Sequence, residues 1–125
     1  MIIYTDGGYK HATNFAYGSC CIEHNDGTLY EIIHWDKFAY PVNTNNEAEY
    51  ATFMESLILL LKIGVKEVIA YTDSQLMQRQ LIKQYKIKKP ELQVYAEKIW
   101  ELMKNFDIIE VRHVPRTIIV GKLGH

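Results

Sequence analysis

The sequence contains little cysteine, and none of it in a spacing typical of a metal site. Its two cysteines, Cys20 and Cys21, are neighbours in the chain. Neighbouring residues of a strand point to opposite faces, so these two are poorly placed to form a disulfide with each other. We interpret them as reduced thiols, which is consistent with a cytoplasmic protein. No Cys-x-x-Cys pair and no Cys/His zinc spacing occurs, which excludes the usual zinc-binding motifs.

Long apolar runs are absent as well. The longest apolar-rich run, Leu57 to Leu61, is far too short to cross a membrane. Met1 leads straight into a strand-like run with Asp6 close behind, which leaves no room for a signal peptide. We therefore expect a cytoplasmic chain with no membrane partner, and the sequence carries no sign of an obligate protein partner.

An excess of positive charge, common in proteins that bind nucleic acid, is also lacking. The chain has 14 Lys and Arg against 15 Asp and Glu, for a formal net charge of -1. This balance argues mildly against a nucleic-acid partner, unless the acids gather in one site and the bases elsewhere. One segment does concentrate bases, because Lys83, Lys86, Lys88 and Lys89 fall within seven residues. The length of 125 residues and the hydrophobic content of 48% predict a single globular domain over residues 1–125.

Alternating and helical hydrophobic patterns predict five strands and three helices. The expected strands are residues 1–5, 15–23, 29–38, 67–72 and 108–114, and the expected helices run from Glu47 to Gly64, from Asp73-Ser74 to about Gln84, and over 91–105. Asp6-Gly7-Gly8 is typical of a turn that stops the first strand. The tail from Pro115 is either irregular or the start of a helix. The order β-β-β-α-β-α-α-β predicts an α/β fold whose first, fourth and fifth strands run parallel.

Three acidic residues share one predicted location. Asp6 and Asp73 follow the first and fourth strands, and Glu49 lies in the first turn of the main helix. Ligands of α/β sheets collect beyond the carboxyl ends of parallel strands, so we expect these three side chains to converge there. Clustered carboxylates repel one another, and hard divalent cations with oxygen ligands relieve that repulsion. Two such ions about 4 Å apart can activate water and stabilise the leaving oxygen of a phosphodiester.

Each of these acids alone also has an ordinary structural explanation. An Asp before Gly-Gly is usually a turn residue, and an Asp before Ser is usually a helix cap. A Glu in the first turn of a helix usually complements the helix dipole. Three acids at one predicted sheet edge are harder to explain in this way.

The segments that contain these acids resemble the signature blocks of type 1 ribonuclease H. They are Tyr4-Thr5-Asp6-Gly7-Gly8, Thr44-Asn45-Asn46-Glu47-Ala48-Glu49-Tyr50 and Tyr71-Thr72-Asp73-Ser74-Gln75. Two later segments, Tyr85-Lys86-Ile87-Lys88-Lys89-Pro90 and His113-Val114-Pro115-Arg116, resemble blocks of its short archaeal-like and bacterial members. Each block alone is weakly specific. Five blocks in order, with family-like spacing over nearly the whole chain, make the resemblance strong.

The resemblance implies a ribonuclease H-like fold, with a five-stranded mixed sheet in the order 3-2-1-4-5 flanked by helices. It implies endonucleolytic hydrolysis of the RNA strand of RNA–DNA hybrids with Mg²⁺ or Mn²⁺, two ions acting with the substrate. It assigns catalysis and metal binding to Asp6, Glu49 and Asp73, and it chooses Glu49 over Glu47. It also implies substrate contacts from Gly7, Asn45, Asn46, Thr72 and Gln75, with Asn45 and Gln75 near the cut.

The C-terminal segment departs from the family pattern, which has a fourth acid at the start of the last helix. No Asp or Glu follows Glu110. A register that aligns residues 121–125 with the pattern places His125 at the acid position, as a fourth catalytic and metal-binding residue. Imidazole suits Mn²⁺ better than Mg²⁺. A register without the longer loop places Leu123 there, which cannot act. Because the sequence stops at His125, we expect the last helix to be missing or truncated.

Two alternatives to an active ribonuclease H remain open. The fold could serve as a degenerate module that holds nucleic acid with weak or no cleavage, because the fourth ligand is lost. It could also carry a nuclease with a different substrate, since one fold hosts several phosphodiester reactions. The presence of Asp6, Glu49 and Asp73 favours hydrolysis.

Overall fold

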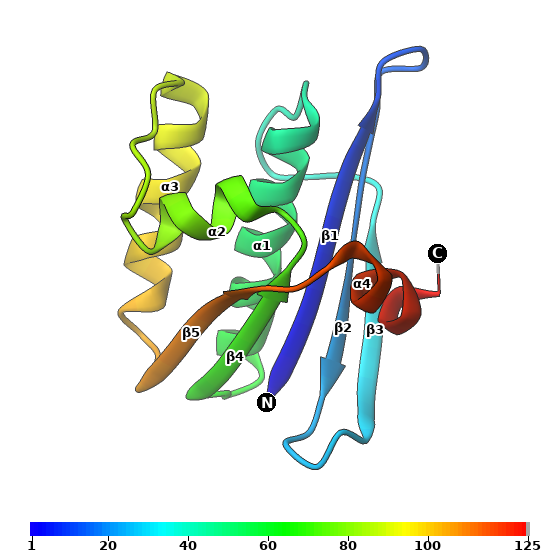
Figure 1. The fold of residues 1–125 in the computed structure, drawn as a ribbon, viewed down its shortest axis with the longest axis vertical. Coiled ribbons are helices and arrows are strands. Elements are labelled where there is room, and N and C mark those ends of the chain that lie inside the picture. The colour runs from blue at the N-terminus through cyan, green and yellow to red at the C-terminus, as the bar shows by residue number, and fades with distance from the viewer. Residues whose placement is uncertain (125) are drawn as a thin grey trace.

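The computed structural model describes residues 1–124, which form one mixed sheet with helices on both of its faces (Figure 1). The elements in chain order are β1 (Ile2–Lys10), β2 (Phe15–Glu23), β3 (Leu29–Trp35), α1 (Asn45–Lys62), β4 (Glu67–Thr72), α2 (Gln75–Leu81), α3 (Pro90–Met103), β5 (Ile108–His113) and α4 (Arg116–Leu123). The five-stranded sheet has the order β3-β2-β1-β4-β5. This order, and the α/β class, confirm the predicted ribonuclease H-like architecture.

Strand direction also follows the prediction. The β1–β2 and β2–β3 pairs are antiparallel, as hairpin connections allow, whereas β1–β4 and β4–β5 are parallel and are joined through helical crossovers. Parallel pairing places the carboxyl ends of β1, β4 and β5 at the same side of the sheet. The segments that follow β4 and β5 therefore start next to each other, although they are far apart in the sequence.

The first strand is longer than predicted. Asp6-Gly7-Gly8 does not stop it, because β2 pairs with β1 along its whole length, from Ile2 opposite Glu23 to Lys10 opposite Phe15. Pairing with β4 ends earlier, at Thr5 opposite Thr72. Asp6 is thus in the middle of a strand, and it is also the first residue of β1 beyond the parallel pair.

The two faces of the sheet are covered unequally. Ile3, Cys20 and Ile22 pack into the main core with the buried face of α1, and α3 packs on α1. Tyr4 and Cys21 point to the opposite face, where Ile119 and Leu123 of α4 cover them. Both cysteines are free and buried, in agreement with the expected reduced thiols. Within residues 1–124, the helices are too short or too polar to traverse a bilayer.

Several boundaries differ from the predicted ones by a few residues. Strand β3 ends at Trp35 and β5 at His113, while α3 begins at Pro90 and ends at Met103. Helix α2 ends at Leu81, because Lys83 adopts a left-handed conformation with φ of 65° that a helix cannot continue through. The tail, for which an irregular run and a helix start were both open, forms the eight-residue helix α4.

Candidate metal centre

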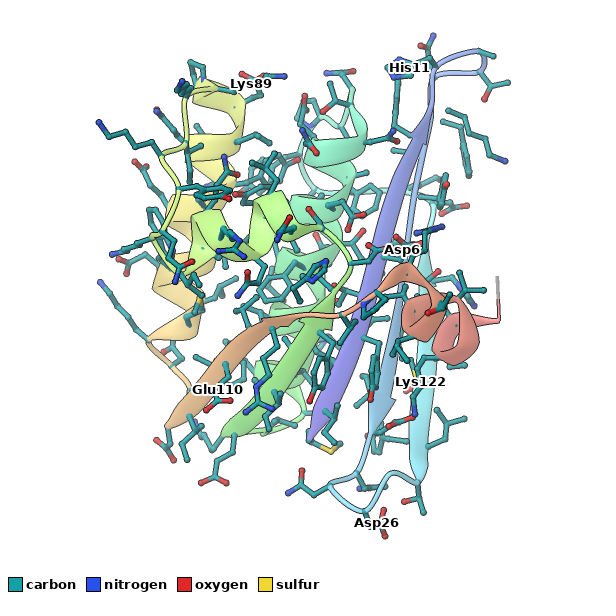
Figure 2. The ribbon with its side chains drawn as sticks, in the orientation of Figure 1. Asp6, His11, Asp26, Lys89, Glu110 and Lys122 are labelled. Atoms are coloured by element: carbon teal, nitrogen blue, oxygen red, sulfur yellow. The ribbon has the colours of Figure 1, made fainter. Side chains whose placement is uncertain are left out.

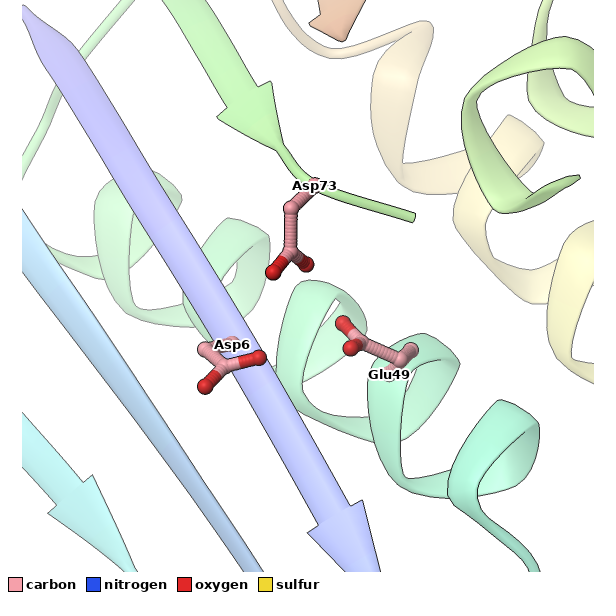
Figure 3. Close-up of side chains that lie close together, drawn as sticks. All are labelled: Asp6, Glu49 and Asp73. Atoms are coloured by element: carbon pink, nitrogen blue, oxygen red, sulfur yellow. The ribbon is translucent and has the colours of Figure 1, made fainter. Parts of the chain in front are cut away.

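Asp6, Glu49 and Asp73 converge as the sequence predicts. One carboxylate oxygen of each lies within 4.8 Å of the others. The three side chains come from β1, α1 and the segment after β4, and they point into a common space (Figure 3). Figure 2 shows Asp6 part-way along β1, beside the start of α4. Three carboxylates from three separate elements thus meet at the carboxyl end of the parallel strands.

The close approach of α1 to β1 depends on Gly7. A Cβ at this position would lie 2.3 Å from the carbonyl oxygen of Ala48, a distance that no side chain tolerates. Gly7 therefore lets the first turn of α1 lie directly on β1, which brings Glu49 to the neighbouring Asp6. The backbone N–H of Gly7 also acts on the Glu49 carboxyl group and lowers its pKa slightly, against the larger effects that raise it.

The start of α1 separates the roles of its two glutamates. Thr44 is the N-cap, and its side-chain oxygen accepts from the backbone N–H of Glu47 at 3.1 Å. The Thr44 hydroxyl in turn donates to Glu47 Oε1 at 3.4 Å, and the backbone N–H of Asn43 donates to Glu47 Oε2 at 3.3 Å, so the Glu47 carboxylate is used at the start of the helix. Two residues later, Glu49 points toward Asp6 and Asp73. The choice of Glu49 over Glu47 for the cluster agrees with this geometry.

The environment of Glu49 opposes its ionisation. Burial raises the pKa of its carboxyl group well above the ordinary value, and the negative charges of Asp6 and Asp73 raise it further. Its Oε2 atom is buried and has no hydrogen-bond partner within residues 1–124. A buried carboxylate oxygen without a partner is costly unless a cation or a proton satisfies it. The donor set, all carboxylate oxygens, is the kind that hard divalent cations prefer. The residues therefore fit a divalent metal ion.

Comparison with known proteins identifies the family of the chain. Residues 4–120 match the model of a family described as reverse transcriptase-like. The chain belongs to this family. It is also 33% identical over 73 residues to ribonuclease HI of Halobacterium salinarum, a match that covers 58% of this chain and 37% of that relative. The match thus spans little more than a third of the length of the curated relative.

Solved structures of the family superpose on nearly the whole chain. The crystal structure of RNase H1 from Halobacterium salinarum has a TM-score of 0.85 and 25% identity, over 94% of this chain and 87% of that one. LC11-RNase H1, isolated from compost, was crystallised in complex with RNA/DNA hybrid. It has a TM-score of 0.83 and 31% identity, over 97% of this chain and 89% of that one. The resemblance to type 1 ribonuclease H is therefore confirmed.

The acidic cluster also contains a basic residue, Arg116, that the sequence analysis did not single out. Nη1 of Arg116, the first residue of α4, lies 2.7 Å from Asp73 Oδ2 and 3.3 Å from Asp6 Oδ1. The arginine belongs to the His113-Val114-Pro115-Arg116 block, but the pattern carried no hint of its partners. The sequence offered one signal for this contact. Arg116 is a basic residue shortly after β5, where the chain passes the carboxyl ends of β4 and β1.

The predicted substrate-contact residues divide into two groups. Asn45 and Gln75 are exposed at the starts of α1 and α2, and Asn46 is half-buried. Gly7 and Thr72 are buried. The Thr72 hydroxyl accepts from the backbone N–H of Ser74 at 3.0 Å and so shapes the turn that carries Asp73. The side chains of Asn45, Asn46 and Gln75 are therefore accessible to a substrate. Gly7 and Thr72 are not, and they position the carboxylates.

The sequence left two registers open for the fourth acid position, one with His125 and one with Leu123. Only Val114 and Pro115 separate β5 from α4, whereas the register for His125 assumes a longer loop. In the register without that loop Leu123 takes the position, and its side chain is buried against the sheet. His125 itself lies outside the described residues, and its role as a fourth ligand stays a prediction.

Proposed function

We propose that this chain is a metal-dependent ribonuclease H that hydrolyses the RNA strand of RNA–DNA hybrids. The observation that carries the proposal is the convergence of Asp6, Glu49 and Asp73, with a buried, unpartnered oxygen of Glu49 among them. Membership of the family and the fold of its solved ribonucleases H support the same reaction class.

The three carboxylates would hold Mg²⁺ or Mn²⁺. When bound, one or two such ions would supply Lewis-acid activation of water and stabilisation of the leaving oxygen. The chain itself contributes the placement of these acids. Asp6 is fixed by the pairing of β1 with β2, Asp73 by the turn at Thr72, and Glu49 by the helix contact at Gly7.

The proposed substrate is supported by amide side chains near the acids and by a separate group of exposed lysines. LC11-RNase H1, a structural relative, was crystallised with RNA/DNA hybrid. In this chain Asn45 and Gln75 offer amide groups beside the cluster, and such groups can bond a 2′-hydroxyl or a phosphate. The four lysines of the α2–α3 connection, Lys83, Lys86, Lys88 and Lys89, are all exposed. Three acids gather in the cluster and four bases in this connection, so the near-zero net charge does not by itself argue against a nucleic-acid partner.

The test is cleavage of labelled substrates by the purified chain. RNA–DNA hybrid, duplex RNA and duplex DNA are each incubated in Mg²⁺ and in Mn²⁺, with Asp73→Asn as the matched variant. We expect cleavage of the hybrid RNA strand alone, with Asp73→Asn inactive but folded by circular dichroism. Cleavage of duplex DNA or RNA would instead indicate a nuclease of different substrate. Tight binding of hybrid without cleavage in either metal would indicate the degenerate binding module.

A further inference from the structure

The guanidinium group of Arg116 lies where the carboxylate cluster would otherwise receive a metal ion. Its Nη1 atom is 2.7 Å from Asp73 Oδ2, and 3.3 and 3.5 Å from the two oxygens of Asp6. One positively charged nitrogen therefore bridges acids from two neighbouring strands. Asp6 and Asp73 are also two of the three acids that would hold a divalent cation.

The backbone around Arg116 fixes this placement. The N–H of Val114 donates to the carbonyl oxygen of Thr72 at 2.9 Å, so the chain leaving β5 stays beside the end of β4. Pro115 then begins the turn into α4, and Arg116 is the first helical residue. The cation is thus delivered to Asp73 by a connection of only two residues.

The two partners differ in their freedom to move. The Asp6 and Asp73 side chains are 5% and 10% exposed, whereas the Arg116 side chain is 60% exposed. Arg116 can leave toward solvent by changing rotamer, while the carboxylates remain where the sheet holds them. The guanidinium group of Arg116 can thus move away, whereas the carboxylates of Asp6 and Asp73 stay in place.

We propose that Arg116 is a tethered competitor of the metal ion: its guanidinium neutralises Asp6 and Asp73 in the metal-free chain and must be displaced for a divalent cation to bind. The inference rests on the proposed function only in taking the cluster as a metal site. Breaking the Arg116 pairs costs free energy, so the observed metal affinity of the chain is lower than that of the carboxylates alone. Arg116 is therefore a residue that sets the metal concentration at which the centre fills.

The direct test is Mn²⁺ binding by calorimetry with the full chain and no nucleic acid. We expect Arg116→Gln to lower the Kd for Mn²⁺ about tenfold, the change produced when a competing state populated at about 90% is removed. Arg116→Lys, which keeps the charge and loses the planar fork, should give a Kd between those of the variant and the parent. Arg112→Gln is the matched control, because it removes a nearby guanidinium that pairs with Glu110 and not with the cluster.

Thermal unfolding supplies a second readout. Arg116→Gln should lower the Tm of the metal-free chain, because Asp6 and Asp73 lose a counter-ion, and should leave the Tm in saturating Mn²⁺ unchanged or higher. Equal effects of Arg116→Gln and Arg112→Gln on the Kd would overturn the proposal and show a general effect of charge. An unchanged Kd for Arg116→Gln would also overturn it.

Glu49→Gln separates the two proposals, since Glu49 does not pair with Arg116 in the structure. If Glu49→Gln abolishes Mn²⁺ binding while Arg116→Gln leaves the Kd unchanged, the metal site stands and the competition fails. If the parent and Arg116→Gln both fail to bind Mn²⁺, the competition and the proposed metal site fail together.

Discussion

The Cα of Gly7 faces the carbonyl oxygen of Ala48 so closely that a Cβ would lie 2.3 Å from that oxygen. This close contact between β1 and α1 helps to set the distance from Asp6 to Glu49. We predict that Gly7→Ala destabilises the fold by about 1–3 kcal/mol, because a backbone atom must move to admit the methyl group. It should also weaken Mn²⁺ binding, because α1 carries Glu49 away from the other two acids.

Thermal unfolding and Mn²⁺ calorimetry measure both effects of Gly7→Ala. Gly121→Ala is the matched control, since a Cβ at this α4 position meets no atom within 4 Å. Alanine in a helix is favoured over glycine by about 0.5–1 kcal/mol, so the control should be unchanged or slightly more stable. Equal Mn²⁺ affinities for Gly7→Ala and the parent would contradict the positioning role of this contact.

The raised pKa of Glu49 predicts a pH dependence of stability in the absence of metal. A carboxyl group with a higher pKa in the folded chain than in the unfolded chain binds its proton more tightly when folded. Its contribution is fully present below its ordinary pKa of 4.5 and is lost as the pH rises through the folded value. We therefore expect Glu49→Gln to raise the Tm in EDTA at neutral pH, and to have a smaller effect near pH 4.5.

Chemical or thermal unfolding of the parent and of Glu49→Gln across this pH range checks the prediction. The difference between the two proteins isolates Glu49 from the other titrating groups. Parallel profiles, with a constant difference in stability, would show that Glu49 does not titrate with a raised pKa.

The exposed amides are predicted to serve substrate binding rather than metal binding. Replacing Asn45 and Gln75 together by Ala removes two side chains, each able to make hydrogen bonds worth about 0.5–1.5 kcal/mol. We expect hybrid affinity to fall about tenfold, by fluorescence anisotropy at fixed salt. The Kd for Mn²⁺ should stay within twofold of that of the parent, as roughly 0.4 kcal/mol or less would allow.

Asn45 has a second contact that the design must account for. Its Oδ1 accepts from the backbone N–H of Tyr9 at 2.7 Å and ties the start of α1 to β1. Asn45→Asp keeps this acceptor and serves as the control for structural loss. If hybrid and Mn²⁺ affinities fall together in the double variant, the assignment of these amides to the substrate is wrong.

His125 yields a prediction about metal preference that follows from the family resemblance. If imidazole takes the place of the fourth carboxylate, activity should be poor in Mg²⁺ and largely restored in Mn²⁺, because a nitrogen ligand favours the later metal. His125→Asp should then shift the optimum toward Mg²⁺. Initial rates in each metal measure the shift. Unchanged rates and metal preference in His125→Ala would leave a three-carboxylate site, in keeping with the short connection before α4.

The sequence by itself determined the class of fold, the strand order and the identity of the three acids. Hydrophobic periodicity suffices for the class of fold, because it marks each element, and the acids lie within recognisable blocks. The strand order followed from the resemblance of those blocks to type 1 ribonuclease H. Even the choice of Glu49 over Glu47 could be made from the block around Thr44. The true length of β1 could not, since pairing with β2 along the whole strand overrode the turn signal of Gly7-Gly8.

Only the tertiary structure decided what surrounds the acids. The contact of Gly7 with Ala48 and the bridge from Arg116 to Asp6 and Asp73 join residues 41 to 110 positions apart, and no local pattern encodes such distances. The same holds for the unpartnered oxygen of Glu49, because its burial and its neighbours come from three different elements. The chain specifies which groups are present, and the packing of α1 and α4 on opposite faces of the sheet specifies the charge that each group meets.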